Sequence, residues 1–169
     1  MVNFEKIKLL VLDFDGVITN NKVYLNEEGI ESVCCNRSDG LGIEMLKNKT
    51  KVEVIVISKE KNPVTLRRCE KLKIQCLNGI DQKHQILLEE IKKRNLDFKE
   101  VCFVGNDIND LECLKLVGIG VATNDAYPEV KEIANYITKK KGGEGAVREV
   151  CDLILISYSP RGNTAWSVA

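Results

Sequence analysis

The sequence lacks several features that mark common functional classes. Its 25 basic and 25 acidic residues give a formal net charge of zero, which argues against a broad basic surface for nucleic acid or anionic membrane. The single histidine, His84, is expected at the surface rather than as a catalytic base. No two of the seven cysteines have the Cys-x-x-Cys spacing of a zinc site. No apolar run could span a bilayer, and we see no signal peptide, internal repeat or low-complexity segment.

What remains has an ordinary globular composition. A chain of 169 residues that is 44% hydrophobic and 30% charged can bury one core, so we predict a single domain over residues 1–156. Residues 157–169 lack periodicity and are expected to form a flexible tail, whose Arg161 could meet an anion in a neighbouring site. Cys102 falls in a buried strand pattern, which indicates reduced thiols and a cytoplasmic location.

The most informative positive feature is an apolar run, residues 9–12, that ends in Asp13-Phe14-Asp15-Gly16. Open α/β sheets bind ligands at the carboxyl ends of their strands. Because residues i and i+2 of an extended chain share a face, Asp13 and Asp15 can face one crevice. Two such carboxylates suit magnesium-assisted phosphoryl transfer, one as nucleophile and one as general acid/base. Taken alone, the motif fits an Asp-rich turn equally well.

Polar residues also follow two further apolar strand patterns. Residues 52–57 lead to Ser58, whose hydroxyl can donate a hydrogen bond to a phosphate oxygen. Residues 101–104 lead to the loop at 105–110, which carries more carboxylates. Carboxyl ends of parallel strands meet at one edge of a sheet, so these groups are predicted to share the crevice.

A lysine in an unusual place supplies one more cluster, which lies between Ser58 and the 105–110 loop in the chain. Asp81 is expected to cap a helix and Lys83 to lie in its first turn. The helix dipole disfavours a cation at this end, so an anionic partner for Lys83 is predicted.

In chain order, the four clusters resemble the four motifs of the haloacid dehalogenase superfamily: Asp13-x-Asp15, Ser58, Lys83 and Gly105-Asn106-Asp107-x-x-Asp110. The resemblance extends to about Ile156, and about 40 residues separate the first two motifs, which leaves no room for a cap domain. This arrangement is similar to the capless subfamily of 3-deoxy-D-manno-octulosonate 8-phosphate phosphatases. The implied fold is α/β, a Rossmann-like doubly wound parallel sheet with an inserted β-hairpin.

Two glycine-containing segments also resemble that subfamily. Residues 37–43 are similar to its Asp-Gly-x-Gly-Ile stretch before the first helix, and residues 141–153 to its C-terminal signature. The amides of Gly142 and Gly143 could approach a substrate anion at a helix start. An ordinary flexible hinge is the alternative explanation for this loop.

The resemblance implies catalytic roles. Asp13 would be the nucleophile and Asp15 the general acid/base, and the Asp15 backbone carbonyl would also bind Mg²⁺. Ser58 and Lys83 would hold the transferring phosphoryl group.

The third metal ligand departs from the family pattern. Asn106 stands where many relatives have an aspartate, and its amide oxygen can bind Mg²⁺ but carries no charge. Asp107 or Asp110 would compensate, directly or through water.

The segment after Ser58 bears on the substrate. The eight-carbon sugar-acid phosphatases typically have Thr-Gly-Arg there, whereas Ser58-Lys59-Glu60 looks more like the branch acting on nonulosonate 9-phosphates of the N-acylneuraminate or KDN type. Glu60, Arg68 and Lys71 are therefore the candidate substrate-selecting residues, although a solvated amphipathic helix explains the last two as well.

Three functions stay open at this point. The favoured one is a Mg²⁺-dependent phosphatase for a phosphorylated 2-keto-3-deoxy sugar acid of nine carbons, working through an aspartyl-phosphate. The alternative is a 3-deoxy-D-manno-octulosonate 8-phosphate phosphatase of lipopolysaccharide synthesis. The second alternative is a non-catalytic oligomerisation module related to acylneuraminate cytidylyltransferase.

A β-hairpin is predicted at residues 21–36, where a cap would otherwise be inserted. A lone hairpin is marginal in water, and Val23 and Leu25 alternate onto a face that needs a partner. In the resembled subfamily such hairpins pack into a tetramer and a neighbour helps to close each active site, so we predict a homotetramer. A hairpin folded against its own domain is the alternative.

Overall fold

The computed structural model describes residues 2–158, and its centre is a sheet of six parallel strands in the order β5-β4-β1-β6-β7-β8. Without the hairpin strands, this order reads 3-2-1-4-5-6 along the chain, as in the Rossmann fold, and confirms the predicted doubly wound α/β class. The strands are Leu9–Leu12 (β1), Glu53–Ile57 (β4), Gln75–Leu77 (β5), Val101–Gly105 (β6), Ile119–Ala122 (β7) and Tyr136–Ile137 (β8).

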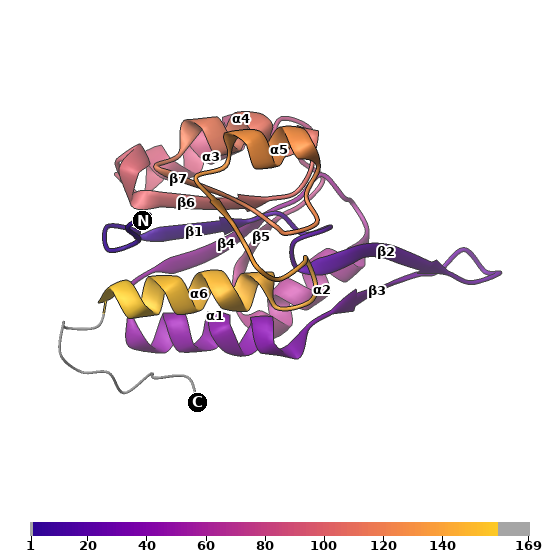
Figure 1. The fold of residues 1–169 in the computed structure, drawn as a ribbon. Helices are drawn as coiled ribbons and strands as arrows, with labels where there is room; N and C mark the ends of the chain where they lie inside the picture. The colour runs from indigo at the N-terminus through magenta and orange to yellow at the C-terminus, as the bar shows by residue number, and fades with distance from the viewer. Residues whose placement is uncertain (1, 159–169) are drawn as a thin grey trace.

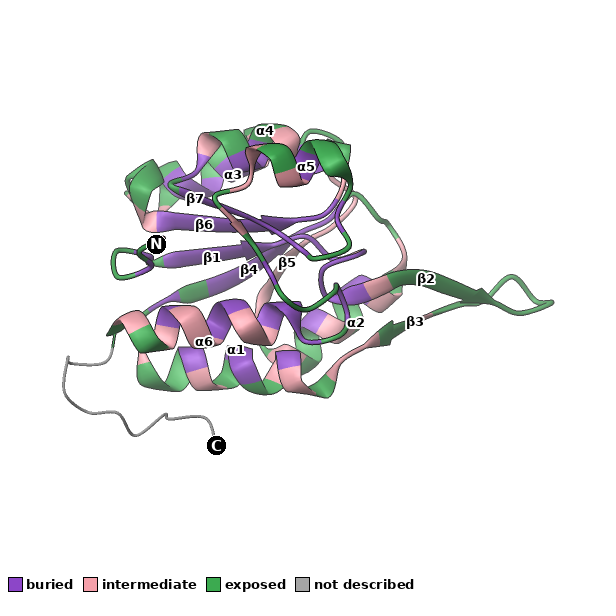
Figure 2. Ribbon diagram, viewed as in Figure 1, coloured by how far each residue is buried: buried purple, intermediate pink, exposed green. Residues whose placement is uncertain are grey.

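Helices cover both faces of this sheet, with α1, α2 and α6 on one face and α3, α4 and α5 on the other (Figure 1). The central strands β1, β6 and β7 are wholly buried (Figure 2), as their continuous apolar runs predicted, whereas the edge strands β5 and β8 are only partly buried. The helices are Arg37–Lys49 (α1), Pro63–Leu72 (α2), Lys83–Lys93 (α3), Leu111–Leu116 (α4), Pro128–Ile133 (α5) and Ala146–Tyr158 (α6), and the short 3₁₀ turns are Phe98–Glu100 (η1) and Ile108–Asp110 (η2).

Strand β1 holds the central place, because it pairs with β4 on one side and β6 on the other. From β1 the sheet continues to β4 and β5 on one side and to β6, β7 and β8 on the other. This reversal of the strand order leaves a crevice at the carboxyl ends of the strands. Asp13 emerges from β1 at this point, and its amide donates to the carbonyl oxygen of Val104 at 3.0 Å. The topology therefore places the first and fourth motifs side by side.

Helices α1 and α6 pack closely through the Asp39-Gly40-x-Gly42 stretch. This stretch lies within α1 and not before it, which corrects the prediction. A Cβ at Gly42 would lie 2.8 Å from the Cδ of Arg148, so glycine here permits close approach of the helices. Asp39 is buried, and its Oδ1 accepts from the Arg148 amide at 2.8 Å, which ties α1 to the start of α6.

The predicted hairpin consists of Thr19–Leu25 (β2) and Glu31–Cys35 (β3), paired antiparallel. It extends away from the sheet and its helices (Figures 1 and 2). Val23 and Leu25 are 56% and 67% exposed, so the alternative in which the hairpin folds against its own domain is not observed.

The end of the domain differs slightly from the expected one. Helix α6 continues to Tyr158, two residues beyond the predicted boundary, and the Tyr158 hydroxyl donates to the carbonyl oxygen of Ile7. The predicted tail from 159 on, with Arg161, lies outside the described residues. Within residues 2–158, no helix combines the length and apolarity that a membrane crossing requires.

The buried Asp39 predicts a pH-dependent stability. Burial raises the pKa of Asp39 to about 6, although the Arg148 amide and the Arg68 guanidinium oppose the shift. Its ionisation therefore costs the folded state more than the unfolded one, and stability is lost as the pH rises from the unfolded value of 3.8 through 6. When the pH is raised from 4.5 to 8, the free energy of unfolding of Asp39→Asn should increase by about 2 kcal/mol relative to that of wild type.

Urea denaturation of both proteins at the two pH values measures this difference. Asp97→Asn is the matched control, because Asp97 is exposed and caps only η1. Parallel pH curves for wild type and Asp39→Asn would contradict the assignment.

Candidate active site

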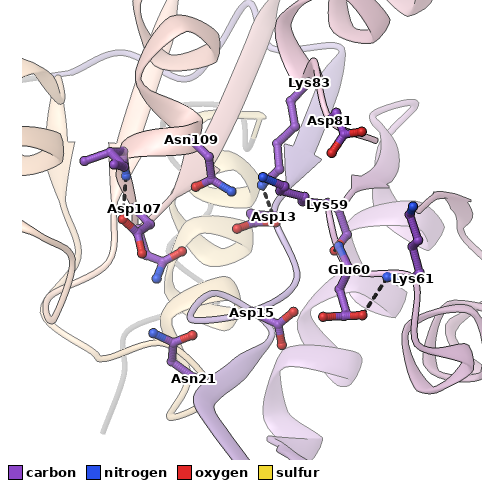
Figure 3. A pocket seen from close by; sticks show the side chains of 13 residues that line it. Asp13, Asp15, Asn21, Lys59, Glu60, Lys61, Asp81, Lys83, Asp107 and Asn109 are labelled. Atoms are coloured by element: carbon purple, nitrogen blue, oxygen red, sulfur yellow. Dashed lines mark hydrogen bonds and ion pairs between the residues drawn. The ribbon is translucent and has the colours of Figure 1, made fainter. Parts of the chain in front are cut away.

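A pocket of about 700 Å³ opens where β1, β4 and β6 end, and most of its lining is polar (Figure 3). It collects residues from all four predicted motifs. The lining residues are Asp13, Asp15, Asn21, Ser58, Lys59, Glu60, Lys61, Asp81, Lys83, Asn106, Asp107, Ile108 and Asn109.

Asp13 and Asp15 face this pocket, and the side chain between them packs into the core. Asp13 is 5% exposed and Phe14 only 1%, so the predicted alternation holds. Asp15 is half-buried, and its Oδ1 accepts from the Thr19 hydroxyl at 3.3 Å. Thr19 thus orients the second carboxylate from the base of the hairpin.

Lys83 is the first residue of α3, and its ammonium is almost wholly buried between two carboxylates. Its Nζ lies 2.7 Å from Asp13 Oδ1 and 2.8 Å from Asp110 Oδ1. The predicted anionic partner is thus found within the protein (Figure 3). The predicted N-cap was wrong, because Gln82 holds that position and Asp81 is exposed at the pocket.

These contacts perturb the proton affinities of the site. Burial, followed by the Asp110 charge, raises the pKa of Asp13 to about 7 against the opposing effect of Lys83. Burial also raises the pKa of Asp15, although the Thr19 hydrogen bond opposes it. Burial lowers the pKa of Lys83, but Asp13 and Asp110 outweigh it and the net shift is upward. Lys83 therefore stays charged, and the raised pKa of Asp15 favours holding a proton for transfer.

Ser58 follows β4 and starts the second wall of the pocket. It is 1% exposed, and its Oγ accepts from the Glu60 amide at 3.1 Å. Glu60 curls back so that its Oε1 accepts from the amides of Lys61 and Asn62 at 2.7 and 2.9 Å. Lys59 and Lys61 line the pocket as well, and the sequence analysis did not single them out.

The loop after β6 provides oxygen atoms for a metal. Asn106 is 5% exposed, and its Oδ1 is buried without a hydrogen-bond partner. An orphaned amide oxygen near two carboxylates is a suitable ligand for a hard cation, so the residues fit Mg²⁺. The described residues contain no cluster of three or more His, Cys, Asp or Glu side chains arranged for a metal.

Asp107 and Asp110 take different places. Asp107 lines the pocket, while its Oδ1 accepts from the Ile108 amide at 2.7 Å. Asp110 is fully buried behind the pocket lining; its Oδ1 meets Lys83 and its Oδ2 accepts from the Asn106 amide at 3.0 Å. Both Asp110 oxygens are thus engaged, which favours a role in positioning Lys83 and Asn106 over direct metal binding.

Two of the three predicted substrate-selecting residues lie outside the pocket of this chain. Arg68 donates through its terminal nitrogen to the Asn36 carbonyl oxygen at 3.1 Å, between α1 and α2. Lys71 is exposed beside a separate hollow of about 280 Å³ between the same helices. Of the three, only Glu60 lines the catalytic pocket.

Gly142 and Gly143 are also placed differently from the prediction. Their amides donate to Asp125 Oδ1 at 2.9 Å and to the Val17 carbonyl oxygen at 3.0 Å, respectively. A Cβ at Gly142 would lie 1.9 Å from the Gly16 carbonyl oxygen. Within one chain, these glycines pack the loop after Asp15 and do not offer free amides to an anion.

Asn21 is a pocket residue that the sequence analysis missed. It adopts a left-handed backbone conformation at φ 62°, where β2 leaves its regular pairing with β3. An Asn-Asn pair at a strand start is the only signal that could have suggested it, because asparagine tolerates this conformation.

Comparison with known proteins agrees with this site. Residues 41–150 match the model of the haloacid dehalogenase-like hydrolase family. The 3-deoxy-D-manno-octulosonate 8-phosphate phosphatase KdsC of Escherichia coli K12 is 36% identical over 154 residues, which cover 90% of this chain and 81% of that protein. The KdsC of Yersinia pestis is 35% identical over 96% of this chain and 87% of its own length.

Solved structures show the same fold. The phosphatase of this type from Moraxella catarrhalis, in complex with a magnesium ion, a phosphate ion and KDO, has a TM-score of 0.88 at 32% identity, covering 91% of this chain and 88% of that chain. The cobalt-bound enzyme YrbI from Haemophilus influenzae has a TM-score of 0.87 at 29% identity, covering 92% and 91%.

The chain belongs to the haloacid dehalogenase-like hydrolase family, and within it to the capless subfamily that contains the 3-deoxy-D-manno-octulosonate 8-phosphate phosphatases. It is a phosphoric monoester hydrolase. The non-catalytic alternative is therefore not supported, and the features specific to sialic acid and KDN find no support among these relatives.

Removal of the Lys83 charge should be strongly destabilising. Lys83→Met would leave Asp13 and Asp110 buried without their counter-ion, and breaking such a buried network costs about 3–5 kcal/mol of unfolding free energy. Urea denaturation at neutral pH measures the loss. The control is Lys115→Met, whose exposed pair with Glu112 should contribute little to stability. Equal small effects of both substitutions would contradict the proposed importance of the buried network.

Proposed function

We propose that this protein is a Mg²⁺-dependent phosphatase that hydrolyses 3-deoxy-D-manno-octulosonate 8-phosphate or a closely similar sugar-acid phosphate through an aspartyl-phosphate. The observation that carries the proposal is the position of Asp13, which faces the pocket beside Asp15 and the buried Lys83. The names of the relatives support the eight-carbon substrate over the nine-carbon one that the sequence favoured.

Each step of the proposed reaction uses groups of this pocket. A carboxylate oxygen of Asp13 attacks phosphorus and displaces the sugar oxygen, which takes a proton from Asp15. Asp15 then removes a proton from water, the water oxygen attacks phosphorus, and Asp13 is released with inorganic phosphate. The Thr19 hydroxyl holds Asp15 during both transfers. Ser58 and Lys83 would hold the phosphoryl oxygens.

The residues that would hold Mg²⁺ are Asp13, the Asp15 backbone carbonyl and Asn106. The ion would offset the repulsion between the Asp13 carboxylate and the anionic phosphate. Asn106 suits this role because its side-chain oxygen is buried and has no other partner. Asp107, at the pocket wall, would contribute charge through water.

Two lysines at the pocket wall suit the carboxylate of a sugar acid. Lys83 is buried between two carboxylates beside the proposed phosphoryl site, so a second cation is needed for the carboxylate of the sugar acid. Lys59 and Lys61 line the same pocket, are exposed, and form no ion pair with the described residues. We assign these two cations to the substrate carboxylate. Glu60 is assigned to the hydroxyl groups of the substrate, which requires its side chain to leave the Lys61 and Asn62 amides.

The hairpin supports assembly into a homotetramer in which neighbours close the active sites. Its exposed apolar residues would be costly to leave in water, and they lie on the element whose base carries Asn21 and Thr19. Arg68 and Lys71, which lie outside their own pocket, could serve a neighbouring one in such an assembly. The exposed apolar residues are Val23, Tyr24, Leu25 and Ile30.

A cytoplasmic location remains part of the proposal. The seven cysteines are free, and Cys69, Cys102, Cys113 and Cys151 are buried. Free thiols in this number suit a reducing compartment.

Phosphate release in the presence of Mg²⁺ tests the proposal. We expect turnover of 3-deoxy-D-manno-octulosonate 8-phosphate to exceed that of N-acylneuraminate 9-phosphate and its deaminated analogue. Asp13→Asn should lose activity by at least about 10³-fold while remaining folded, because an amide cannot replace the nucleophile. A preference for nine-carbon esters would show that the substrate is a nonulosonate 9-phosphate instead, and an active Asp13→Asn would refute the mechanism.

The double variant Lys59→Met, Lys61→Met tests the carboxylate assignment in the same assay. KM for the sugar-acid ester should rise about 10-fold or more, since two charge-assisted contacts are lost. KM for a phosphate ester without a carboxylate should change less. Lys99→Met, an exposed lysine on η1, is the control. Equal effects on both substrates would reject the assignment.

A further inference from the structure

The turn that follows β7 contacts three separate parts of the site. Residues 123–127, here called the β7 turn, do not line the pocket. Thr123 is fully buried; its hydroxyl donates to the Gly16 carbonyl oxygen at 3.3 Å and its amide to the Gly105 carbonyl oxygen at 3.2 Å. The amide of Tyr127 donates to the Asn106 carbonyl oxygen at 2.9 Å. The β7 turn therefore joins the nucleophile loop to the loop of the metal motif.

The same turn also holds the glycine loop, residues 141–145. Asn124 donates from its side chain to the Thr138 carbonyl oxygen at 3.1 Å, and its amide donates to the Lys140 carbonyl oxygen at 3.2 Å. Asp125 Oδ1 accepts from the Gly142 amide at 2.9 Å. Three consecutive side chains, of Thr123, Asn124 and Asp125, thus bind two segments: the chain at Gly16 and the stretch from Thr138 to Gly142.

The glycine loop in turn presses on the residues after Asp15. A Cβ at Gly143 would lie 2.4 Å from the Asn20 nitrogen, and its own amide donates to the Val17 carbonyl oxygen at 3.0 Å. Figure 1 shows this loop, which leads into α6, lying against the base of β2. The loop is thus packed so tightly against this segment that no side chain would fit between them, and a displacement of one is transmitted to the other.

We propose that Asp125 is a positioning residue for the phosphatase reaction: its bond to the Gly142 amide seats the glycine loop, and the loop fixes the chain from Gly16 to Thr19. Thr19 then sets the orientation of Asp15 through its hydroxyl. Gly16 also abuts Asn106, since a Cβ there would lie 2.0 Å from Asn106 Nδ2. Asp125 thereby acts on both Asp15 and Asn106 without touching substrate. This inference rests on the proposed function.

The test compares Asp125→Ala with Asp125→Asn. Alanine removes the acceptor for the Gly142 amide, whereas asparagine keeps an oxygen in the same place. We expect kcat of the alanine variant to fall about 10- to 100-fold with KM changed less than about threefold, because a misplaced catalytic group lowers the rate more than binding. Asp125→Asn should restore kcat to within about threefold of wild type. Asp97→Ala, which removes a 2.9 Å side-chain bond to the Lys99 amide on η1, should leave kcat unchanged.

Backbone hydrogen exchange provides a readout independent of activity. In Asp125→Ala, the amides of Gly142 and Gly143 should exchange about 10-fold faster or more, while amides of β1 and β6 keep their protection. Wild-type kcat and exchange in Asp125→Ala, or an asparagine variant as impaired as alanine, would overturn the inference. If the wild type releases no phosphate from any ester, the proposed function fails instead, and the exchange measurement still tests the contact.

Discussion

The buried ion network of Lys83, Asp13 and Asp110 is the constraint on which the site depends. Three charges removed from water are tolerated only when their geometry is complementary. Lys83 reaches both carboxylates from the first turn of α3, at 2.7 and 2.8 Å. Asp110 uses its second oxygen for the Asn106 amide. One network thus fixes Asp13, the proposed nucleophile, together with the loop that carries Asn106 and the start of α3.

The buried network and the acidic pocket neutralise different charges. The protein neutralises part of the Asp13 charge with its own lysine, and the remaining negative charge favours a divalent cation. Lys59 and Lys61, which are exposed and have no described ion-pair partner, stay available to the organic end of an anionic substrate. Burial raises the pKa of Asp15 above its ordinary value, which is the direction that suits the general acid proposed for it.

Much of this could be predicted from the sequence. Apolar runs that end in polar clusters predicted that Asp13, Asp15, Ser58 and the loop after residue 104 share one crevice, and the structure brings them to one pocket with Lys83. The doubly wound fold class and the interest in Asn106 came from the family resemblance. The hydrogen-bond partners of residues beyond the strand ends could not be predicted from the sequence, because they depend on packing between distant segments. The sequence predicts that the Gly142 and Gly143 amides bind an anion, but they donate hydrogen bonds to the Asp125 side chain and the Val17 carbonyl oxygen. The hydrogen-bond partners of Asp110 and Arg68 are likewise set by tertiary contacts.

The central position of β1 has a consequence for how the protein is made. Leu9 pairs with Glu53 on one side and with Val101 on the other. Nearly a hundred further residues must therefore be synthesised before β1 can pair with its second neighbour, β6. The glycine loop that closes over Gly16 is synthesised later still. Folding is therefore dominated by contacts between segments far apart in the chain, a topology that slows folding. A nascent chain would therefore present Asp13 and Asp15 at the ribosome well before their pocket could form.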